Sequence, residues 1–239
     1  MAGADPVSKT ADLPVRTLSA LVMVAIAGAA LWLGGAAWSL FVLAVGCGVL
    51  WEFARLVIGF EKRAGMRIAW LAGGLLYVGL ATLTLLVMRS PFYGVFPVLA
   101  VVATVIGVDV GAYFAGRTIG GPKIAPKISP SKTWAGLAGG MLGACLVLAL
   151  LMAAKWRMEL DAGVTGAGAP NWLEALLGIP FAVIAQAGDF FESGMKRRAG
   201  VKDSSNLIPG HGGLFDRVDG LIAVLFVIGF IGLSSSIPA

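Results

Sequence analysis

The sequence predicts an all-α integral membrane protein, a polytopic bundle of about seven transmembrane helices. Of its 239 residues, 58% are hydrophobic and 13% are charged, and the mean hydropathy is +0.89. These values lie outside the range of soluble domains. Apolar stretches of roughly 17 to 25 residues, long enough to cross a bilayer, recur along the whole chain. They leave no room for a separate soluble domain, so we expect a single domain over 1–239.

Seven apolar spans follow one another along the chain. The first comes after a polar leader, and AGAA at 27–30 resembles a signal-peptidase site. We nevertheless expect an uncleaved first helix, because Gly34 and Gly35 provide a tight turn directly into the next span. The expected spans are about 18–33, 37–57, 68–88, 95–115, 135–154, 174–192 and 218–236.

The positive charges predict how these spans are oriented. Lysine and arginine near helix ends favour the cytoplasmic side of a membrane. If the N-terminus is cytoplasmic, all of the 18 lysines and arginines fall on that side except Arg89, Lys155 and Arg157. We therefore predict a cytoplasmic N-terminus and a C-terminus on the opposite side.

The chain is expected to divide into N-terminal helices, about 1–94, and a C-terminal half, about 95–239, with two cytoplasmic loops. These loops, about 116–134 and 195–217, are dense in Gly, Pro, Ser, Lys and Arg. Glycines at GxxxG spacing within 136–143 predict close helix packing. The formal charge of +5 suits an anionic bilayer surface or an anionic substrate. We expect membrane lipids, and no nucleic acid, among the partners.

An aspartate inside an apolar span needs a partner, because an unpaired carboxylate there costs about 2.5 to 3.5 kcal/mol on insertion scales. In VDVGAYFAGR, Asp109, Tyr113 and Arg117 are spaced i, i+4, i+8 and would share one helix face that leads to the cytoplasmic surface. This face is either part of a binding site or an internal Asp–Arg pair that only fixes helix packing.

A second polar stripe lies in GDFFESGMKR. Asp189, Glu192, Ser193 and Lys196 fall at i, i+3, i+4 and i+7 and would also share one helix face. Packing alone does not explain carboxylates, a hydroxyl and an ammonium group that enter the membrane together. The stripe therefore indicates a binding site at the inner end of this span.

Two further aspartates, Asp216 and Asp219, begin the last span in FDRVDG. If Asp189 and Asp216 converge, they supply the hard oxygen ligands that Mg²⁺ prefers, with water and phosphate completing its shell. The glycines of PGHGG, 209–213, would let backbone NH groups approach an anion. Cationic side chains for phosphate lie nearby at Lys196, Arg197, Arg198 and Lys202.

These features together describe a metal–phosphate site. The alternative is a solvated basic loop beside the membrane, which explains the cations but neither the intramembrane aspartates nor PGHGG. The loop GRTIGGPKIAPKISPSKTWAGLAGG contributes more lysines and hydroxyls, and its prolines predict a shaped loop that closes over a nucleotide or lipid headgroup. Its SKT is not a P-loop, because Ser131 stands where that motif requires Gly.

Two isolated titratable residues remain. His211 is a candidate general base, or it orients the loop and bonds a phosphate oxygen; we favour substrate positioning. Glu52, in WEFARL near the inner end of the second span, has no evident partner, and we expect it to reach the membrane interface.

The region 193–219 resembles the signature of the phosphatidate cytidylyltransferases, also called CDP-diacylglycerol synthases. The resemblance extends over 27 residues with the polar positions in register. Upstream, 109–140, with AYFAGR and SPSKTWAGLAGG, resembles a second block of the family, although Ala135 stands where many relatives carry Glu. The matching positions are Ser193, Met195, Lys196, Arg197, Lys202, Asp203, Ser205, Ile208, Pro209, His211, Gly212, Gly213, Leu214, Asp216, Arg217, Val218 and Asp219.

The resemblance implies transfer of CMP from CTP to phosphatidic acid, which gives CDP-diacylglycerol and pyrophosphate. It also implies Mg²⁺, with a second metal or a monovalent cation as a further occupant of the site. The expected location is a bacterial-type cytoplasmic (inner) membrane with the active site facing the cytoplasm. A homodimer is expected from the resemblance and from the GxxxG face.

By similarity to the family, Asp189 and Asp216 would hold the metal, with Asp219 in support. Lys196 and His211 complete the expected catalytic set. Catalysis would then consist of positioning and charge neutralisation. The expected substrate-binding residues are Ser193, Arg197, Lys202, Asp203, Arg217, Arg117, Ser129, Lys132 and Thr133.

Two other functions compete with this interpretation. A CTP-dependent kinase of a lipid alcohol would release CDP instead of pyrophosphate. A transporter of an anionic solute would use the intramembrane aspartates, Asp109 and Asp189, as part of a proton or ion path. Neither accounts for the whole signature.

Overall fold

The computed structural model describes residues 6–164 and 168–235, with side chains from residue 14 onward. Seven helices in these ranges are long and apolar enough to cross a membrane. This confirms the predicted all-α membrane bundle. The helices are α1 (Pro6–Leu33), α2 (Gly35–Phe60), α3 (Ala64–Met88), α4 (Phe96–Thr118), α5 (Trp134–Asp161), α6 (Gly178–Ala199) and α7 (Phe215–Ser235), and a 3₁₀ turn, η1 (Trp172–Leu177), leads into α6.

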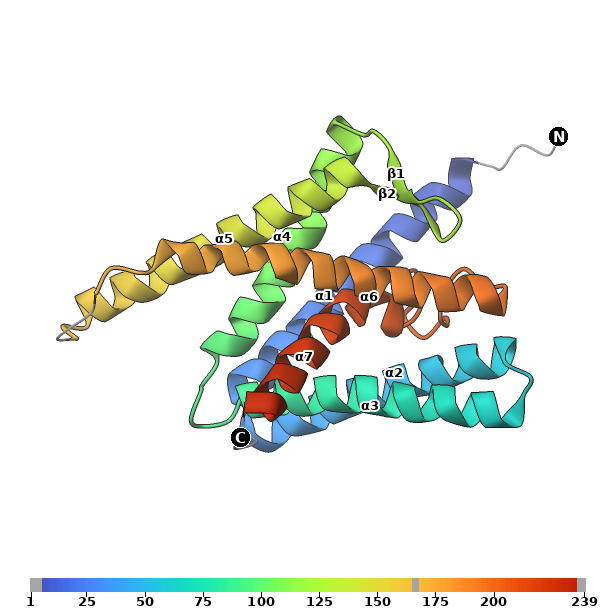
Figure 1. Ribbon diagram of the computed structural model, residues 1–239, viewed down its shortest axis with the longest axis horizontal. Helices are drawn as coiled ribbons and strands as arrows, with labels where there is room; N and C mark the ends of the chain where they lie inside the picture. The colour runs from blue at the N-terminus through green and yellow to red at the C-terminus, as the bar shows by residue number, and fades with distance from the viewer. Residues whose placement is uncertain (1–5, 165–167, 236–239) are drawn as a thin grey trace.

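The charged connections gather at one end of the bundle. Figure 1 shows the turn between α2 and α3, the segment between α4 and α5 and the loop between α6 and α7 at the same end as the start of α1. The other three connections and the end of α7 lie at the opposite end. The helices therefore alternate in direction, as the charge pattern requires, and the side of the membrane on which the N-terminus lies stays a prediction.

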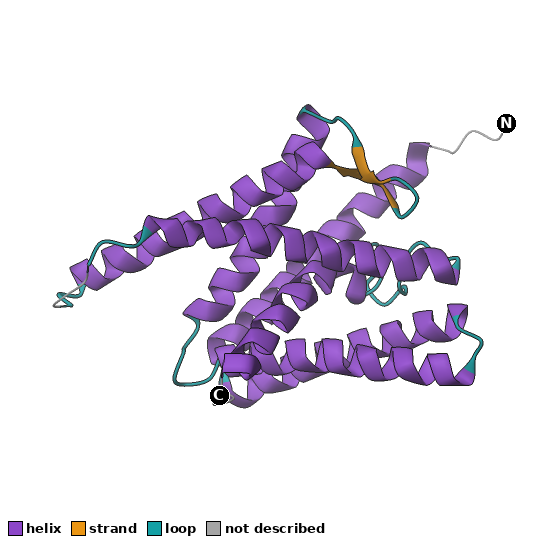
Figure 2. Ribbon diagram, in the orientation of Figure 1, coloured by secondary structure: helices purple, strands orange, loops and turns teal. Residues whose placement is uncertain are grey.

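The two polar loops differ from the expected ones. The first contains an antiparallel hairpin of β1 (Lys123–Ala125) and β2 (Ser129–Thr133), in which Lys123 is paired with Thr133 (Figure 2). The second is shorter than predicted, 200–214, because α6 continues through MKRRA. Lysine and arginine favour helix and suit the negative end of its dipole, and Gly200 ends the helix in the left-handed conformation with φ of 70°.

Helices α4 and α5 pack through facing glycines. A Cβ atom added to Gly111 would lie 2.2 Å from the carbonyl oxygen of Gly139, and one added to Gly143 would lie 2.2 Å from that of Gly107. No residue with a side chain fits at such a contact. The predicted GxxxG packing is confirmed, but α4 of the same chain occupies the face that we expected to support a dimer.

The core that supports the polar residues comes from α2, α3, α6 and α7. Phe215 is completely buried, and its ring centroid lies 6.1 Å from that of Phe53 on α2. Met195 of α6 belongs to the same buried cluster. The start of α7 and the end of α6 are therefore fixed against α2.

Candidate active site

Eight polar side chains from α4, β2, α6 and α7 line one pocket of about 200 Å³, which we call the acidic pocket. The predicted stripe on α6 lies along it, and the aspartates of α4 and α7 complete it. The structure thus brings Asp189 and Asp216 together, as the metal hypothesis requires, whereas the role of each residue stays a prediction. The lining residues are Asp109, Lys132, Asp189, Glu192, Ser193, Lys196, Asp216 and Asp219.

Lys196 links the helices α6 and α7 inside the acidic pocket. Its Nζ lies 2.5 Å from Oε2 of Glu192 and donates to Oδ1 of Asp216 at 2.6 Å. Glu192 is only 1% exposed, and among the described residues its Oε1 has no hydrogen-bond partner. A buried carboxylate oxygen without a donor is costly, so Oε1 of Glu192 has the capacity for one more bond.

The loop 200–214 folds around Asp216. Its Oδ2 accepts from the backbone NH of Gly213 at 2.8 Å, and from the NH and the hydroxyl of Ser204, each at 2.9 Å. Gly210 and Gly212 have φ of 75° and 81°, which only glycine adopts readily, and they make the turn that brings Gly213 to the carboxylate. One NH group of PGHGG therefore binds an anion of the protein itself.

Lys132 reaches the acidic pocket from the hairpin and forms an ion pair with Asp189. Burial lowers the pKa of Lys132, and the carboxylates of Asp219, Asp109 and Glu192 oppose this shift. The hairpin is also attached to the end of α6, where Nε of Arg197 donates to the carbonyl of Ile128 at 3.3 Å. Lys132 of the hairpin therefore lines one side of the acidic pocket, and the shaped loop that the prolines predicted is a β-hairpin at this place.

Three predicted residues around the hairpin have other neighbours. Arg117 donates from Nη1 to the hydroxyl of Tyr113 at 2.8 Å, so it is directed at the tyrosine and not at Asp109. The hydroxyl of Thr133 accepts from the NH of Gly136 at 3.0 Å and caps α5. Ser129 is buried at the start of β2.

His211 faces α1 and does not line the acidic pocket. Its Nδ1 lies 2.8 Å from Oγ of Ser19, and its carbonyl accepts from Nε and Nη2 of Arg217 at 3.0 and 2.6 Å. The two remaining predicted residues, Lys202 and Asp203, are exposed on the loop 200–214. Four residues of the family signature therefore lie outside the acidic pocket: Lys202, Asp203 and His211 in the loop 200–214, and Arg217 at the start of α7.

The expectation for Glu52 is wrong, because this side chain is completely buried. Its carboxylate accepts hydrogen bonds from the loop 200–214 and the first residue of α7. A carboxylate inside an apolar span needs a partner, and this argument, which pointed to Asp109 and Asp189, also applied to Glu52. Its partners could not be identified from the sequence because they lie more than 150 positions away. The donors are the hydroxyls of Ser204 and Ser205, at 2.9 and 2.5 Å, and the NH groups of Leu214 and Phe215, at 2.9 and 2.6 Å.

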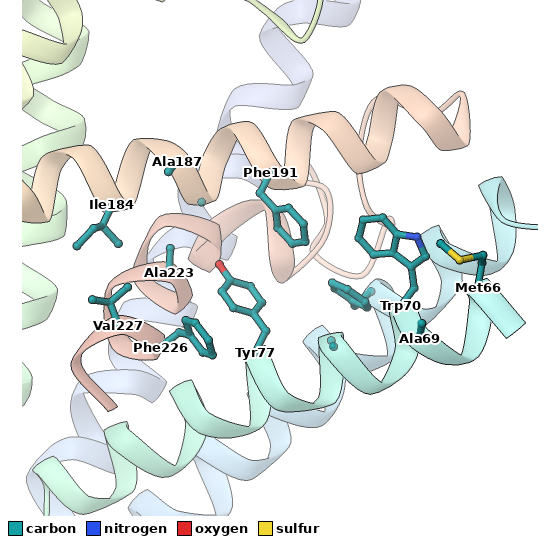
Figure 3. Close-up of a pocket in the computed structure, with 14 residues that line it drawn as sticks. Met66, Ala69, Trp70, Tyr77, Ile184, Ala187, Phe191, Ala223, Phe226 and Val227 are labelled. Atoms are coloured by element: carbon teal, nitrogen blue, oxygen red, sulfur yellow. The ribbon is translucent and has the colours of Figure 1, made fainter. Parts of the chain in front are cut away.

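A second, apolar pocket of about 630 Å³ lies beside the acidic pocket, between α2, α3, α6 and α7. Aromatic side chains, including Trp70, Tyr77 and Phe191, project into it (Figure 3). On α6 and α7 its lining residues Gly188 and Ala223 stand close in sequence to the aspartates of the acidic pocket. We call this space the apolar pocket.

The charge balance of the acidic pocket favours a cation. Five carboxylates face two ammonium groups, which leaves a formal charge of −3 if all are ionised (−5 + 2). In the ranges 6–164 and 168–235, no three ligating side chains already form a metal-binding group. Carboxylates are the type of ligand that Mg²⁺ prefers, and Oε1 of Glu192 has an unused lone pair, whereas Asp189 and Asp216 are paired with Lys132 and Lys196 in this structure.

Comparisons with known proteins identify the family of the chain. A model of the cytidylyltransferase family matches residues 61–234. The phosphatidate cytidylyltransferase of Brucella suis is 34% identical over 275 residues, which cover 95% of this chain and 97% of that protein. The one from Pseudomonas aeruginosa is 34% identical over 267 residues, 89% of this chain and 94% of that protein.

A third relative matches more closely over a shorter region. The phosphatidate cytidylyltransferase of Haemophilus influenzae is 40% identical over 139 residues, which cover 57% of this chain and 46% of that protein. The family model and the relatives together confirm the resemblance to the phosphatidate cytidylyltransferases that the sequence showed. The chain is an enzyme that belongs to the cytidylyltransferase family.

Proposed function

We propose that this enzyme transfers CMP from CTP to phosphatidic acid and so forms CDP-diacylglycerol and pyrophosphate for phospholipid synthesis. The observation that supports this most directly is the acidic pocket beside the apolar pocket, with α6 and α7 lining both. Phosphates of a nucleotide and of a lipid fit the first, and the hydrocarbon part of the lipid fits the second. The similarity to phosphatidate cytidylyltransferases along most of the chain supports the same substrates.

In the proposed reaction, an oxygen of the lipid phosphate attacks the α-phosphorus of CTP. A phosphorus–oxygen bond forms there, and the bond to the oxygen that bridges the α- and β-phosphates breaks. That oxygen leaves with the electron pair as part of pyrophosphate. Because the ionised lipid phosphate is already a nucleophile, the step requires no residue to remove a proton, and His211 has a positioning role.

Mg²⁺ is the proposed cofactor, held by Asp189 and Asp216 with Asp219 in support, and a second metal or a monovalent cation is a further candidate. When bound, the cation neutralises charge on the phosphate oxygens and stabilises the leaving pyrophosphate. Lys132 and Lys196 hold the carboxylates of the acidic pocket in place and add positive charge where the two phosphates would approach each other.

The site is proposed to face the cytoplasm of a bacterial-type inner membrane. CTP is a soluble anion, and the charged connections at the end of the bundle next to the acidic pocket suit its arrival from that side (Figure 1). A homodimer is proposed from the family resemblance alone, since the GxxxG face is used within the chain.

The test is incubation of detergent-purified protein with phosphatidic acid, α-labelled CTP and Mg²⁺, with and without a chelator. Label in the lipid phase with an equal amount of pyrophosphate, and loss of both with chelator, is the expected result. Labelled CDP without labelled lipid would instead indicate a lipid kinase. A folded Asp216→Asn variant with near wild-type turnover would contradict the metal assignment.

A further inference from the structure

We infer that Glu52 is a positioning residue: from α2, it holds the loop 200–214 and the start of α7 in the arrangement that directs Asp216 into the acidic pocket. This inference rests on the proposed function only in giving Asp216 a part in the reaction. Glu52 itself does not line the acidic pocket. It acts through Ser204 and through the backbone around Asp216.

The hydrogen bonds to Glu52 use all the acceptor capacity of its carboxylate. Oε1 accepts from the hydroxyl of Ser205 and the NH of Leu214, and Oε2 accepts from the hydroxyl of Ser204 and the NH of Phe215. An ionised carboxylate has about four lone-pair sites, so four donors saturate it. A saturated carboxylate can remain buried, and it fixes each donor at a defined place.

Two of these donors belong to the start of α7. The first NH groups of a helix have no partner within the helix, and a carboxylate near that end also interacts favourably with the helix dipole. Leu214 and Phe215 stand immediately before Asp216, so Glu52 of α2 caps the helix whose first turn contains the pocket aspartate. A shift of this cap would move Asp216 with it.

Ser204 connects the two carboxylates directly. Its Oγ lies 2.9 Å from Oε2 of Glu52 and 2.9 Å from Oδ2 of Asp216. A hydroxyl has one proton to donate, so the two carboxylates share it. With the proton directed at Glu52, Asp216 keeps the backbone NH groups of Ser204 and Gly213. The position and charge of Glu52 therefore determine what Asp216 receives from Ser204.

The loop leaves no room for a side chain at position 213. A Cβ atom added to Gly213 would lie 2.0 Å from Oγ of Ser204 and 2.6 and 2.7 Å from the two carboxylate oxygens of Glu52. The backbone thus closes directly over the carboxylate. This contact gives a physical reason for glycine at 213, next to the NH group that binds Asp216.

The Glu52→Gln variant tests the inference, because its amide cannot replace the carboxylate. Each oxygen of Glu52 accepts from one backbone NH, so either orientation of the amide places its NH₂ group against the NH of Leu214 or of Phe215. We expect kcat to fall by about 10²-fold, as a small displacement of a reacting group produces. KM for CTP should change little, because the interaction that is lost stabilises the transition state and not the bound substrate.

Three variants complete the design. Glu61→Gln makes the same change at the end of the same helix, where Glu61 is partly exposed, and should leave kcat unchanged. Glu52→Asp keeps the charge and should recover part of the lost kcat. Ser204→Ala removes only the bridging hydroxyl, and we expect kcat to fall by about tenfold. In the double variant with Glu52→Gln, the fall in kcat should be smaller than the product of the two single effects.

A second measurement is independent of activity. Trypsin cleavage after the exposed Lys202 should be faster in Glu52→Gln than in wild type and in Glu61→Gln, because the loop 200–214 is released. If kcat per folded enzyme and cleavage rate both match wild type, the inference is wrong. A wild-type enzyme that forms no CDP-diacylglycerol would refute the proposed function instead, and the cleavage rates would still decide whether Glu52 holds the loop.

Discussion

Replacing Lys196 with methionine should destabilise the protein strongly. Its ammonium group lies 2.5 Å from Glu192 and 2.6 Å from Asp216, and the side chains of the three residues are 13%, 1% and 5% exposed. Methionine has a similar length and no charge, so it leaves two buried carboxylates facing each other. Removing one partner of a buried ion pair costs about 3 to 5 kcal/mol. Oε1 of Glu192 already lacks a partner among the described residues, whereas Oδ2 of Asp216 keeps its donors from Ser204 and Gly213, so the loss falls mainly on Glu192.

The free energy of unfolding can be measured by denaturant titration in micelles. Lys155→Met is the matched control, because Lys155 and Glu159 form an exposed pair at 3.7 Å, worth about 0 to 1 kcal/mol. Adding Glu192→Gln to Lys196→Met should recover part of the stability, since it removes the negative charge that has lost its partner. A Lys196→Met variant that loses no more stability than Lys155→Met would refute the reasoning.

Three further changes address other parts of the molecule. Gly111→Ala should destabilise the protein by about 1 to 3 kcal/mol because its Cβ would meet the backbone of Gly139. Gly28→Ala, which lies in open space, is the control, and equal melting temperatures of the two variants would contradict the packing of α4 against α5. His211→Gln should reduce kcat far less than the about 10²- to 10⁴-fold that a general base contributes, and a loss in that range would make His211 catalytic. Gly73→Phe should fill the apolar pocket and raise KM for phosphatidic acid but not for CTP. Gly79→Phe on the same helix is the control, and an unchanged KM for phosphatidic acid in Gly73→Phe would argue against lipid binding in the apolar pocket.

The helices and the polar stripe could be predicted from the sequence because both depend on local patterns. Apolar runs and charge asymmetry gave the spans, and helical periodicity placed Asp189, Glu192, Ser193 and Lys196 on one face. The continuation of α6 to Ala199 was missed because a run of basic residues is equally typical of a loop. The glycine at position 200, which ends α6 in the left-handed conformation, was the signal that could have indicated this helix end.

The long-range contacts could not be predicted in the same way. Nothing near Glu52 in the sequence indicates that its donors come from residues 204–215, and nothing near His211 indicates that its ring faces Ser19. Such pairings arise from how α1 and α2 pack beside the last loop. The glycines of α5 were identified as a packing face, but their partner on α4 is known only from the folded chain.

The burial of Glu52 has a consequence for how the protein is made. Ser204, its nearest donor in sequence, follows it by 152 residues. At a synthesis rate of about 5 to 20 residues per second, that donor emerges roughly 8 to 30 s after the carboxylate. During this interval α2 is complete, yet its acidic residue faces no native donor. The N-terminal helices therefore cannot reach their final packing by themselves: assembly of this membrane bundle finishes at α2 only when its last helix has arrived.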